Sequence, residues 1–149
     1  MAQNKERPNV FVTAICENVL EEKDGVLSAI RFIDRVQGSL PSDVPDEVVI
    51  PVKVAILVMM WAGDARGKRL LSLSITNPKG ETVPAGPPVT LVFTEEYQGG
   101  NTIMRIVAGL TASGRYMFNV MLDDEIISRL PLEMTLTREE PAEPTTPNV

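Results

Sequence analysis

Apolar side chains recur at every second position in several segments of this chain, and this period of two constrains the fold more than any other feature. The clearest example is residues 115–122, in which Tyr116, Phe118 and two aliphatic residues share one face. The same alternation occurs in residues 71–76, 89–94 and 130–137. Because an α-helix repeats every 3.6 residues, a period of two predicts β-strands in all of these segments.

Other segments are rich in strand-forming residues without alternating so cleanly. They are residues 9–19, 26–36, 50–61 and 102–110. Turns rich in glycine, proline, asparagine and aspartate separate most of the segments, and residues 37–47 are the longest irregular connection. No stretch of ten or more residues combines a helical period with helix caps. About eight short strands at this spacing predict an all-β sandwich or barrel.

The sequence around Tyr116 favours the sandwich. The chain turns through Gly114 and reaches Tyr116 at the second position of a predicted strand. In immunoglobulin-like sandwiches a tyrosine at the start of a late strand donates a hydrogen bond to upstream backbone, an arrangement called the tyrosine corner. We therefore predict an antiparallel immunoglobulin-like β-sandwich of about eight strands.

The strands are expected to form one domain with a tail at each end. A chain of 149 residues is long enough to bury a core within a single domain. We assign residues 9–137 to the sandwich and residues 1–8 to a flexible N-terminal tail. Residues 138–149 contain three prolines and three glutamates, a composition typical of disorder, and form the predicted C-terminal tail.

The absence of histidine limits the chemistry that this chain can perform. Histidine is the commonest general base and metal ligand, and the chain has none. The single cysteine, Cys16, lies in an apolar strand pattern and is expected to be buried and inert. We therefore expect no enzyme activity, no cofactor and no metal site. One cysteine also permits no intrachain disulfide, which favours a reducing compartment.

Charge and hydropathy exclude two classes of partner. The formal net charge is -6, and no basic run is present to neutralise a nucleic-acid backbone. The longest apolar stretch, residues 54–62, is nine residues long, whereas a membrane-spanning helix needs about 20. The N-terminus lacks an apolar signal core. We expect a cytoplasmic protein that binds neither nucleic acid nor membranes.

Short motifs occur in a distinctive order along the chain. They are Cys16-Glu17-Asn18-Val19, Asp24-Gly25, Ser28-Ala29-Ile30-Arg31 with Asp34, Asn77-Pro78-x-Gly80, Gly114-x-Tyr116-x-Phe118-x-Val120, and Arg129-x-Pro131-Leu132. In this order they resemble a family of uncharacterised bacterial proteins of about this length, over roughly residues 10–136. The resemblance implies a small β-sandwich of prokaryotic origin with no assigned activity. It supplies no functional residues.

Apolar residues on the expected outer faces of the sandwich are the candidate site. Met117 and Met121 lie on the face opposite Tyr116 and Phe118, and Met59 lies opposite its apolar neighbours. Outer faces of sandwich strands are normally polar, so something is expected to cover these residues. Two explanations remain open. The covering segment is either part of this chain, residues 37–47 or 84–88, or another protein chain.

We therefore predict a non-catalytic protein-binding or assembly module that contacts a partner protein or itself through a sandwich face or edge. The interface residues named by the pattern are Met59, Trp61, Met117 and Met121. Trp61 is also a candidate cap of the core.

Two alternatives belong to other classes of protein. A ligand-binding module would use the end loops, residues 63–67 and 123–125, for carbohydrate or Ca²⁺. A carbohydrate platform normally needs more than one exposed aromatic ring, and none of the acidic turns has the spacing of a calcium loop. A hydrolase with paired carboxylates ranks last.

Overall fold

A computed structural model describes residues 6–45 and 48–139, which form two packed β-sheets. The strands are β1 (Asn9–Glu21), β2 (Leu27–Phe32), β3 (Arg35–Leu40), β4 (Ile50–Trp61), β5 (Gly67–Thr76), β6 (Thr82–Pro84), β7 (Val89–Phe93), β8 (Thr102–Leu110), β9 (Gly114–Leu122) and β10 (Glu125–Arg138). One sheet has the order β2-β1-β4-β8, and the other has the order β3-β10-β9-β5-β6 with β7 also paired to β5. In the described part of the chain, no helix is long and apolar enough to cross a membrane.

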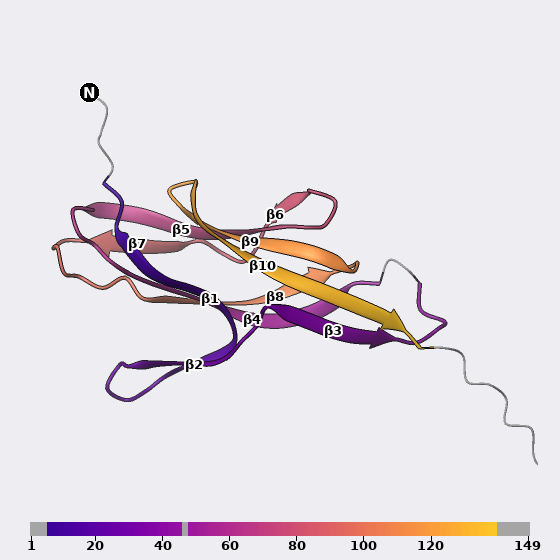
Figure 1. Cartoon of the computed structure of the whole chain (residues 1–149). Helices are drawn as coiled ribbons and strands as arrows, with labels where there is room; N and C mark the ends of the chain where they lie inside the picture. The colour runs from indigo at the N-terminus through magenta and orange to yellow at the C-terminus, as the bar shows by residue number, and fades with distance from the viewer. Residues whose placement is uncertain (1–5, 46–47, 140–149) are drawn as a thin grey trace, which may run out of the picture.

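The predicted all-β sandwich is confirmed, and its core comes from the alternating segments. Figure 1 shows β5, β9 and β10 stacked over β1, β4 and β8. The side chains between these layers form one buried cluster, to which β9 contributes Tyr116 and Phe118 and β10 contributes Leu132 and Met134. Every second residue of these strands faces the opposite sheet, so the period of two in the sequence becomes a shared apolar core.

The strand count differs from the prediction of about eight, since the described residues form ten strands. The predicted strand 26–36 is divided because the chain leaves one sheet at Ile33 and Asp34 and enters the other as β3. The expectation of an irregular connection at residues 37–47 is wrong for residues 37–40, which belong to β3 and pair in parallel with β10. As an edge strand, β3 is held by its backbone ladder and needs no strong apolar pattern. The short strand β6 accounts for the other addition.

Beyond Cys16, β1 no longer pairs with β4, and this end of β1 folds with β2 as a hairpin over the outer face of β4. Figure 1 shows the hairpin below β4, on the side away from the other sheet. Val19 of β1 packs there with Ala55 and Leu57 of β4, and Leu27 of β2 borders the same cluster. The Arg105 guanidinium on β8 donates a hydrogen bond of 2.9 Å from Nη2 to the carbonyl oxygen of Val19. This hairpin explains why β4 is apolar on both faces.

The predicted tails lie mostly outside the described residues, which exclude 1–5 and 140–149. The part of the N-terminal segment that is described contacts the sandwich. Arg69 donates a hydrogen bond of 2.7 Å from Nη1 to the carbonyl oxygen of Glu6, and Arg7 forms a 2.6 Å ion pair with Glu125. At the other end β10 continues to Arg138, one residue beyond the predicted domain boundary.

Candidate interaction surface

The four predicted interface residues form two pairs on opposite outer faces of the sandwich. On β4, Met60 enters the main core, so its neighbours Met59 and Trp61 point away from that core. On β9, Phe118 and Val120 enter the core, which places Met117 and Met121 on the outer face of the six-stranded sheet. A single flat interface therefore cannot contain all four residues.

Residues 37–40 and Ala85, which belong to the two segments proposed to cover the methionines of β9, do not lie over them. Residues 37–40 extend the edge of the six-stranded sheet as part of β3, and Ala85 packs against the main core. The outer face of this sheet is largely a polar ladder. Asn119 donates hydrogen bonds from Nδ2 to the hydroxyls of Ser74 at 3.2 Å and Thr76 at 3.1 Å. Met117 pairs across the strands with Thr76, and Met121 with Ser72.

The face that carries Met59 and Trp61 is apolar and includes a second aromatic ring. Trp61 stacks on Tyr97, with ring centroids 5.4 Å apart and an interplanar angle of 21°. Tyr97 is 75% exposed and lies in the loop between β7 and β8. Met59 pairs across the strands with Val12 of β1, and Ala14 follows Val12 on the same face.

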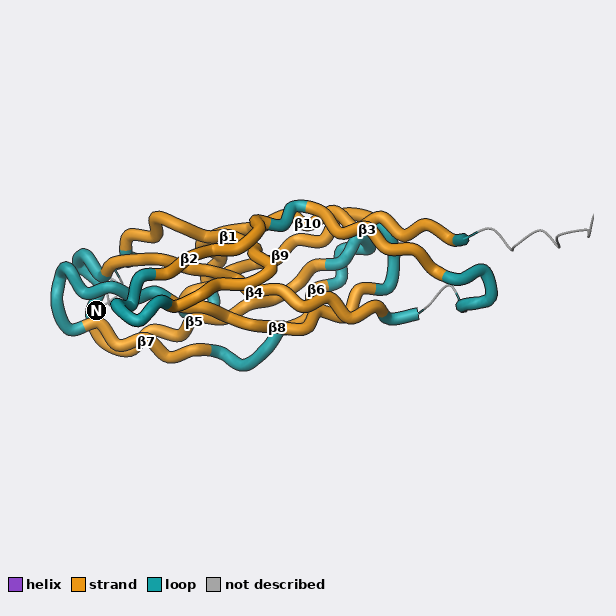
Figure 2. Tube along the Cα trace, turned by 90° about the horizontal axis from the view of Figure 1, so that it is seen from below, coloured by secondary structure: helices purple, strands orange, loops and turns teal. Residues whose placement is uncertain are grey.

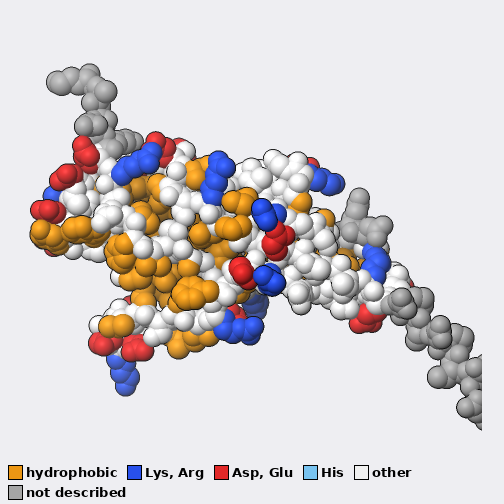
Figure 3. All heavy atoms as spheres, in the orientation of Figure 1, with side chains coloured by type: hydrophobic (Ala, Val, Ile, Leu, Met, Phe, Trp, Pro, Cys, Tyr) orange, Lys and Arg blue, Asp and Glu red, His pale blue; other side chains and the backbone are white. Residues whose placement is uncertain are grey.

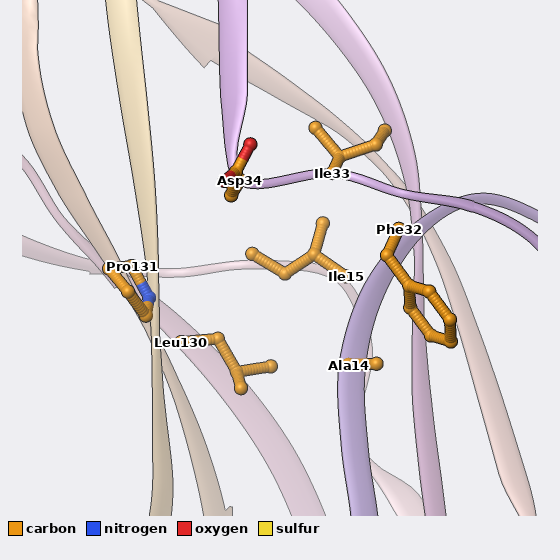
Figure 4. A pocket seen from close by; sticks show the side chains of 7 residues that line it. All are labelled: Ala14, Ile15, Phe32, Ile33, Asp34, Leu130 and Pro131. Carbon is orange, nitrogen blue, oxygen red and sulfur yellow. The ribbon is translucent and has the colours of Figure 1, made fainter.

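A hollow of about 350 Å³ continues this face toward the seam between the two sheets. Figure 4 shows Leu130 and Pro131 of β10 on one side of it, Ala14 and Phe32 on the other, and Ile15 between them. Ile33 and Asp34 complete the lining at the point where the chain crosses between sheets. The Phe32 side chain is 72% exposed, so a large aromatic ring stands at the rim of an apolar hollow.

These neighbours form a continuous apolar stripe along β1. Tyr97 stacks on Trp61, Met59 lies on the same face of β4 as Trp61, and Val12 pairs with Met59. Ala14 follows Val12 on β1 and shares the hollow with Phe32. We define the apolar stripe as these six residues: Tyr97, Trp61, Met59, Val12, Ala14 and Phe32. Figure 3 shows hydrophobic side chains gathered in a band over this side of the molecule, between β10 and the β1–β2 hairpin. A contiguous apolar surface with protruding aromatic rings is suited to contact another protein.

Sequence reasoning missed Tyr97 and Phe32, which are the most exposed members of the stripe. Tyr97 is a single aromatic residue among polar neighbours, Phe32 stands between Arg31 and Ile33, and neither belongs to an alternating segment. For Tyr97 the sequence did contain a signal. An aromatic ring in the acidic turn Glu95-Glu96-Tyr97 is expected to be exposed, because the turn is too polar to be part of the core.

The end loops considered for ligand binding use their polar groups internally. Asp123 contacts the Arg69 guanidinium through Oδ2, and its Oδ1 accepts a 2.9 Å hydrogen bond from the Leu70 amide. Arg66 donates from Nη1 to the carbonyl oxygens of Gly63 at 2.6 Å and Ala65 at 2.7 Å. Among residues 6–45 and 48–139, no three acidic or cysteine side chains come together in a group that could hold a metal ion.

Cys16 lies between the hairpin and β4 and is fully buried. Burial desolvates the thiolate and raises the pKa of the Cys16 thiol above its ordinary value of 9.0. A raised pKa keeps the thiol protonated at neutral pH, so Cys16 behaves as a small apolar side chain rather than as a nucleophile.

No protein-family model matches the chain, and no curated protein matches its sequence. The resemblance to a family of uncharacterised bacterial proteins therefore stays a prediction.

Proposed function

We propose that this protein is a non-catalytic protein-binding or assembly module that contacts its partner through the apolar stripe. The observation that carries this proposal is the exposure of two aromatic rings, Tyr97 at 75% and Phe32 at 72%, at the two ends of one continuous apolar surface. Exposed aromatic residues beside apolar hollows are the groups that supply most of the binding energy in protein interfaces. Met59 adds an adaptable side chain between the two ends.

The location of the stripe also supports protein binding. The β1–β2 hairpin already covers part of the outer face of the four-stranded sheet, where Val19 packs with Ala55 and Leu57 of β4. The stripe runs along β1 and ends on the hairpin at Phe32, where a partner would extend the existing apolar packing. The charged groups near Phe32, such as Asp34, sit at the margin of the hollow, as in the polar rim of an interface.

Affinity capture with matched variants tests the proposal. The double variant Phe32→Ser/Tyr97→Ser removes both exposed rings, while Val83→Ser removes a side chain of 57% exposure from β6 on the other sheet. We expect the wild type and Val83→Ser to capture the same partner protein from cell lysate. The double variant should fail to capture it. Recovery of the same proteins by all three chains would contradict the proposal.

One observation favours a second function, carbohydrate binding. The stacked pair of Trp61 and Tyr97 supplies the second aromatic ring that a sugar platform needs. Trp61 is the only tryptophan, so its fluorescence reports directly on this site. A saturable fluorescence change with glucose, galactose or N-acetylglucosamine oligomers, lost in Tyr97→Ala, would establish sugar binding. An unchanged signal with all of these sugars leaves protein binding as the function of the stripe.

We further propose that the sandwich is immunoglobulin-like. Three features support this assignment: β4 and β8 are neighbours in one sheet, β5, β9 and β10 are neighbours in the other, and the Tyr116 hydroxyl at the start of β9 bonds to upstream backbone. We also propose a cytoplasmic location, which the single buried thiol of Cys16 supports. Fractionation of cells that express the chain tests the location.

A further inference from the structure

The edge of the four-stranded sheet formed by β8 differs from the other sheet edges of the molecule. Edge strands expose unpaired backbone N–H and C=O groups, and proteins protect them with prolines, charges, bulges or short length. β8 has nine residues, no proline and one charge, Arg105, and its ladder with β4 runs from Ile50↔Leu110 to Val58↔Thr102 without a bulge. Figure 2 shows β8 along one margin of the molecule.

The other edges of the described sheets are shorter than β8 or carry protective features that it lacks. β2, the opposite edge of the four-stranded sheet, has six residues, and Arg31 within it has a positive φ of 52°. β6 has three residues and ends in Pro84, and β7 has five residues directly after two prolines. β3 is six residues long and stops before Pro41. The first half of β1 contains a bulge between Val10 and Val12 and packs against β10 through a 2.8 Å hydrogen bond between the hydroxyls of Thr13 and Ser128.

Apart from its ladder with β4, β8 makes no backbone–backbone hydrogen bond to any other segment that the structure describes. Val107, near its middle, is 60% exposed on the outer face. An extended strand is the partner that would satisfy a row of backbone groups of this kind.

We propose that β8 pairs with β8 of a second copy of this chain in antiparallel orientation, joining two four-stranded sheets into one continuous sheet. The two-fold axis is perpendicular to the sheet and passes through Ile106. In this register Arg105 lies opposite Val107 of the second copy, and all nine residues of β8 are paired.

The sequence of β8 is self-complementary in this register. Met104 lies opposite the small Ala108 of the second copy, so a large side chain meets a small one on the inner face. Each Val107 covers the aliphatic stem of the opposite Arg105, and no like charges face each other. Shifting the axis to Arg105 would place the two guanidinium groups opposite each other, which is destabilising. Glu17 lines the same hollow as Lys53 and Arg105, so the charges beside the edge are mixed.

Two substitutions at Val107 with opposite charge test both the edge and the register. Val107→Lys places a cation opposite Arg105 of the second copy twice per dimer, and we expect the dissociation constant of the dimer to rise about tenfold. Val107→Glu places a carboxylate opposite the same guanidinium, and we expect a dimer at least as tight as the wild type. Val83→Lys, on β6, is the matched control and should leave the dimer unchanged.

The measurement is analytical ultracentrifugation over a range of protein concentrations, with a thermal unfolding curve for each variant to show that it is folded. A wild type that stays monomeric at every concentration would overturn the proposal. Equal weakening by Val107→Lys and Val107→Glu would overturn it as well, because the effect would then be independent of the opposite Arg105. The variant Phe32→Ser/Tyr97→Ser should remain dimeric, so this test is independent of the apolar stripe.

Discussion

The Tyr116 hydroxyl fixes the start of β9 to the turn that precedes it. It donates a hydrogen bond of 2.8 Å to the carbonyl oxygen of Ala112 and accepts hydrogen bonds from the amides of Thr111 at 3.3 Å and Ala112 at 3.1 Å. The ring itself is buried in the core. One side chain therefore stabilises both the packing of the sandwich and the conformation of a turn, as the sequence predicted.

The Tyr116→Phe substitution should lower the free energy of unfolding by about 1.5 kcal/mol. It keeps the buried ring and removes only the hydroxyl that holds the turn, and a buried hydrogen bond contributes about that much. Urea denaturation measures the change. Tyr97→Phe is the control, because the Tyr97 ring is exposed and its loss of a hydroxyl should change stability little. Equal stabilities for Tyr116→Phe and the wild type would show that water replaces the three hydrogen bonds at no cost.

Cys16 should make the stability of the protein fall at alkaline pH. Burial raises the pKa of its thiol, so the unfolded chain loses the thiol proton at a lower pH than the folded chain. The folded state then binds more protons, and stability declines as the pH rises past the ordinary thiol value of 9.0, by up to about 1.4 kcal/mol per pH unit.

Chemical denaturation between neutral and alkaline pH, compared with the Cys16→Ala variant, isolates this contribution from that of other titrating groups. The variant should lack the additional alkaline slope even though its overall stability is lower. The same slope in both proteins would mean that the thiol does not couple to folding.

At the scale of elements, the β1–β2 hairpin is held by a small cluster separate from the main core. Val19 is 1% exposed in this cluster, whereas its neighbour Leu20 is 47% exposed. Val19→Ala should cost about 2 kcal/mol, because it removes two buried methyl-sized groups and leaves a cavity. Leu20→Ala is the matched control with little expected effect.

Amide hydrogen exchange should locate that effect in the hairpin. If the hairpin opens by itself, exchange in β2 should accelerate about 30-fold in Val19→Ala while exchange in β9 stays unchanged. Equal acceleration in β2 and β9 would indicate that the hairpin opens only when the whole sandwich unfolds.

Elements with a strong pattern could be predicted from the sequence, and elements held by backbone pairing could not. The segments around Phe118 and Leu132 alternate because each faces the core on one side only, and β4 and β8 begin and end where the sequence indicates. β3 was missed because the edge strand around Gly38 is stabilised by its ladder with β10, a partner about 100 residues away in the chain.

The candidate surface was predicted in part. The pattern placed Met59 and Trp61 on an outer face, and the structure adds Tyr97 and Phe32 to the same stripe. A sequence cannot show which isolated aromatic residues become neighbours, because that depends on the path of the chain between the sheets. The same limit explains why Met117 was grouped with residues on the opposite face.

At the scale of the whole molecule, the two sides of the four-stranded sheet differ in character. The apolar stripe runs along β1 on one side of β4, and β8 forms the sheet edge on the other side of β4. The six-stranded sheet presents a polar ladder around Asn119 instead. A dimer through β8 would therefore leave two apolar stripes at the far ends of one continuous sheet, each free to bind a partner.

The parallel pairing of β3 with β10 connects the first third of the chain to its last third, and a disulfide can test its register. Gln37 and Thr135 are Cα partners, and paired strands are about 4.8 Å apart, which a disulfide can span. Gln37→Cys/Thr135→Cys should form the bond under mild oxidation and close a loop of about 100 residues. The oxidised form should be more stable than the reduced form by about 4 kcal/mol in urea denaturation.

A shifted pair provides the control for this prediction. In Gln37→Cys/Thr137→Cys the two Cα atoms would be about 8 Å apart, too far for an unstrained disulfide. Because Cys16 is buried, it should not compete for either new thiol. Faster cross-linking of the shifted pair than of Gln37→Cys/Thr135→Cys would mean that β3 lies two residues away from the register of its ladder with β10.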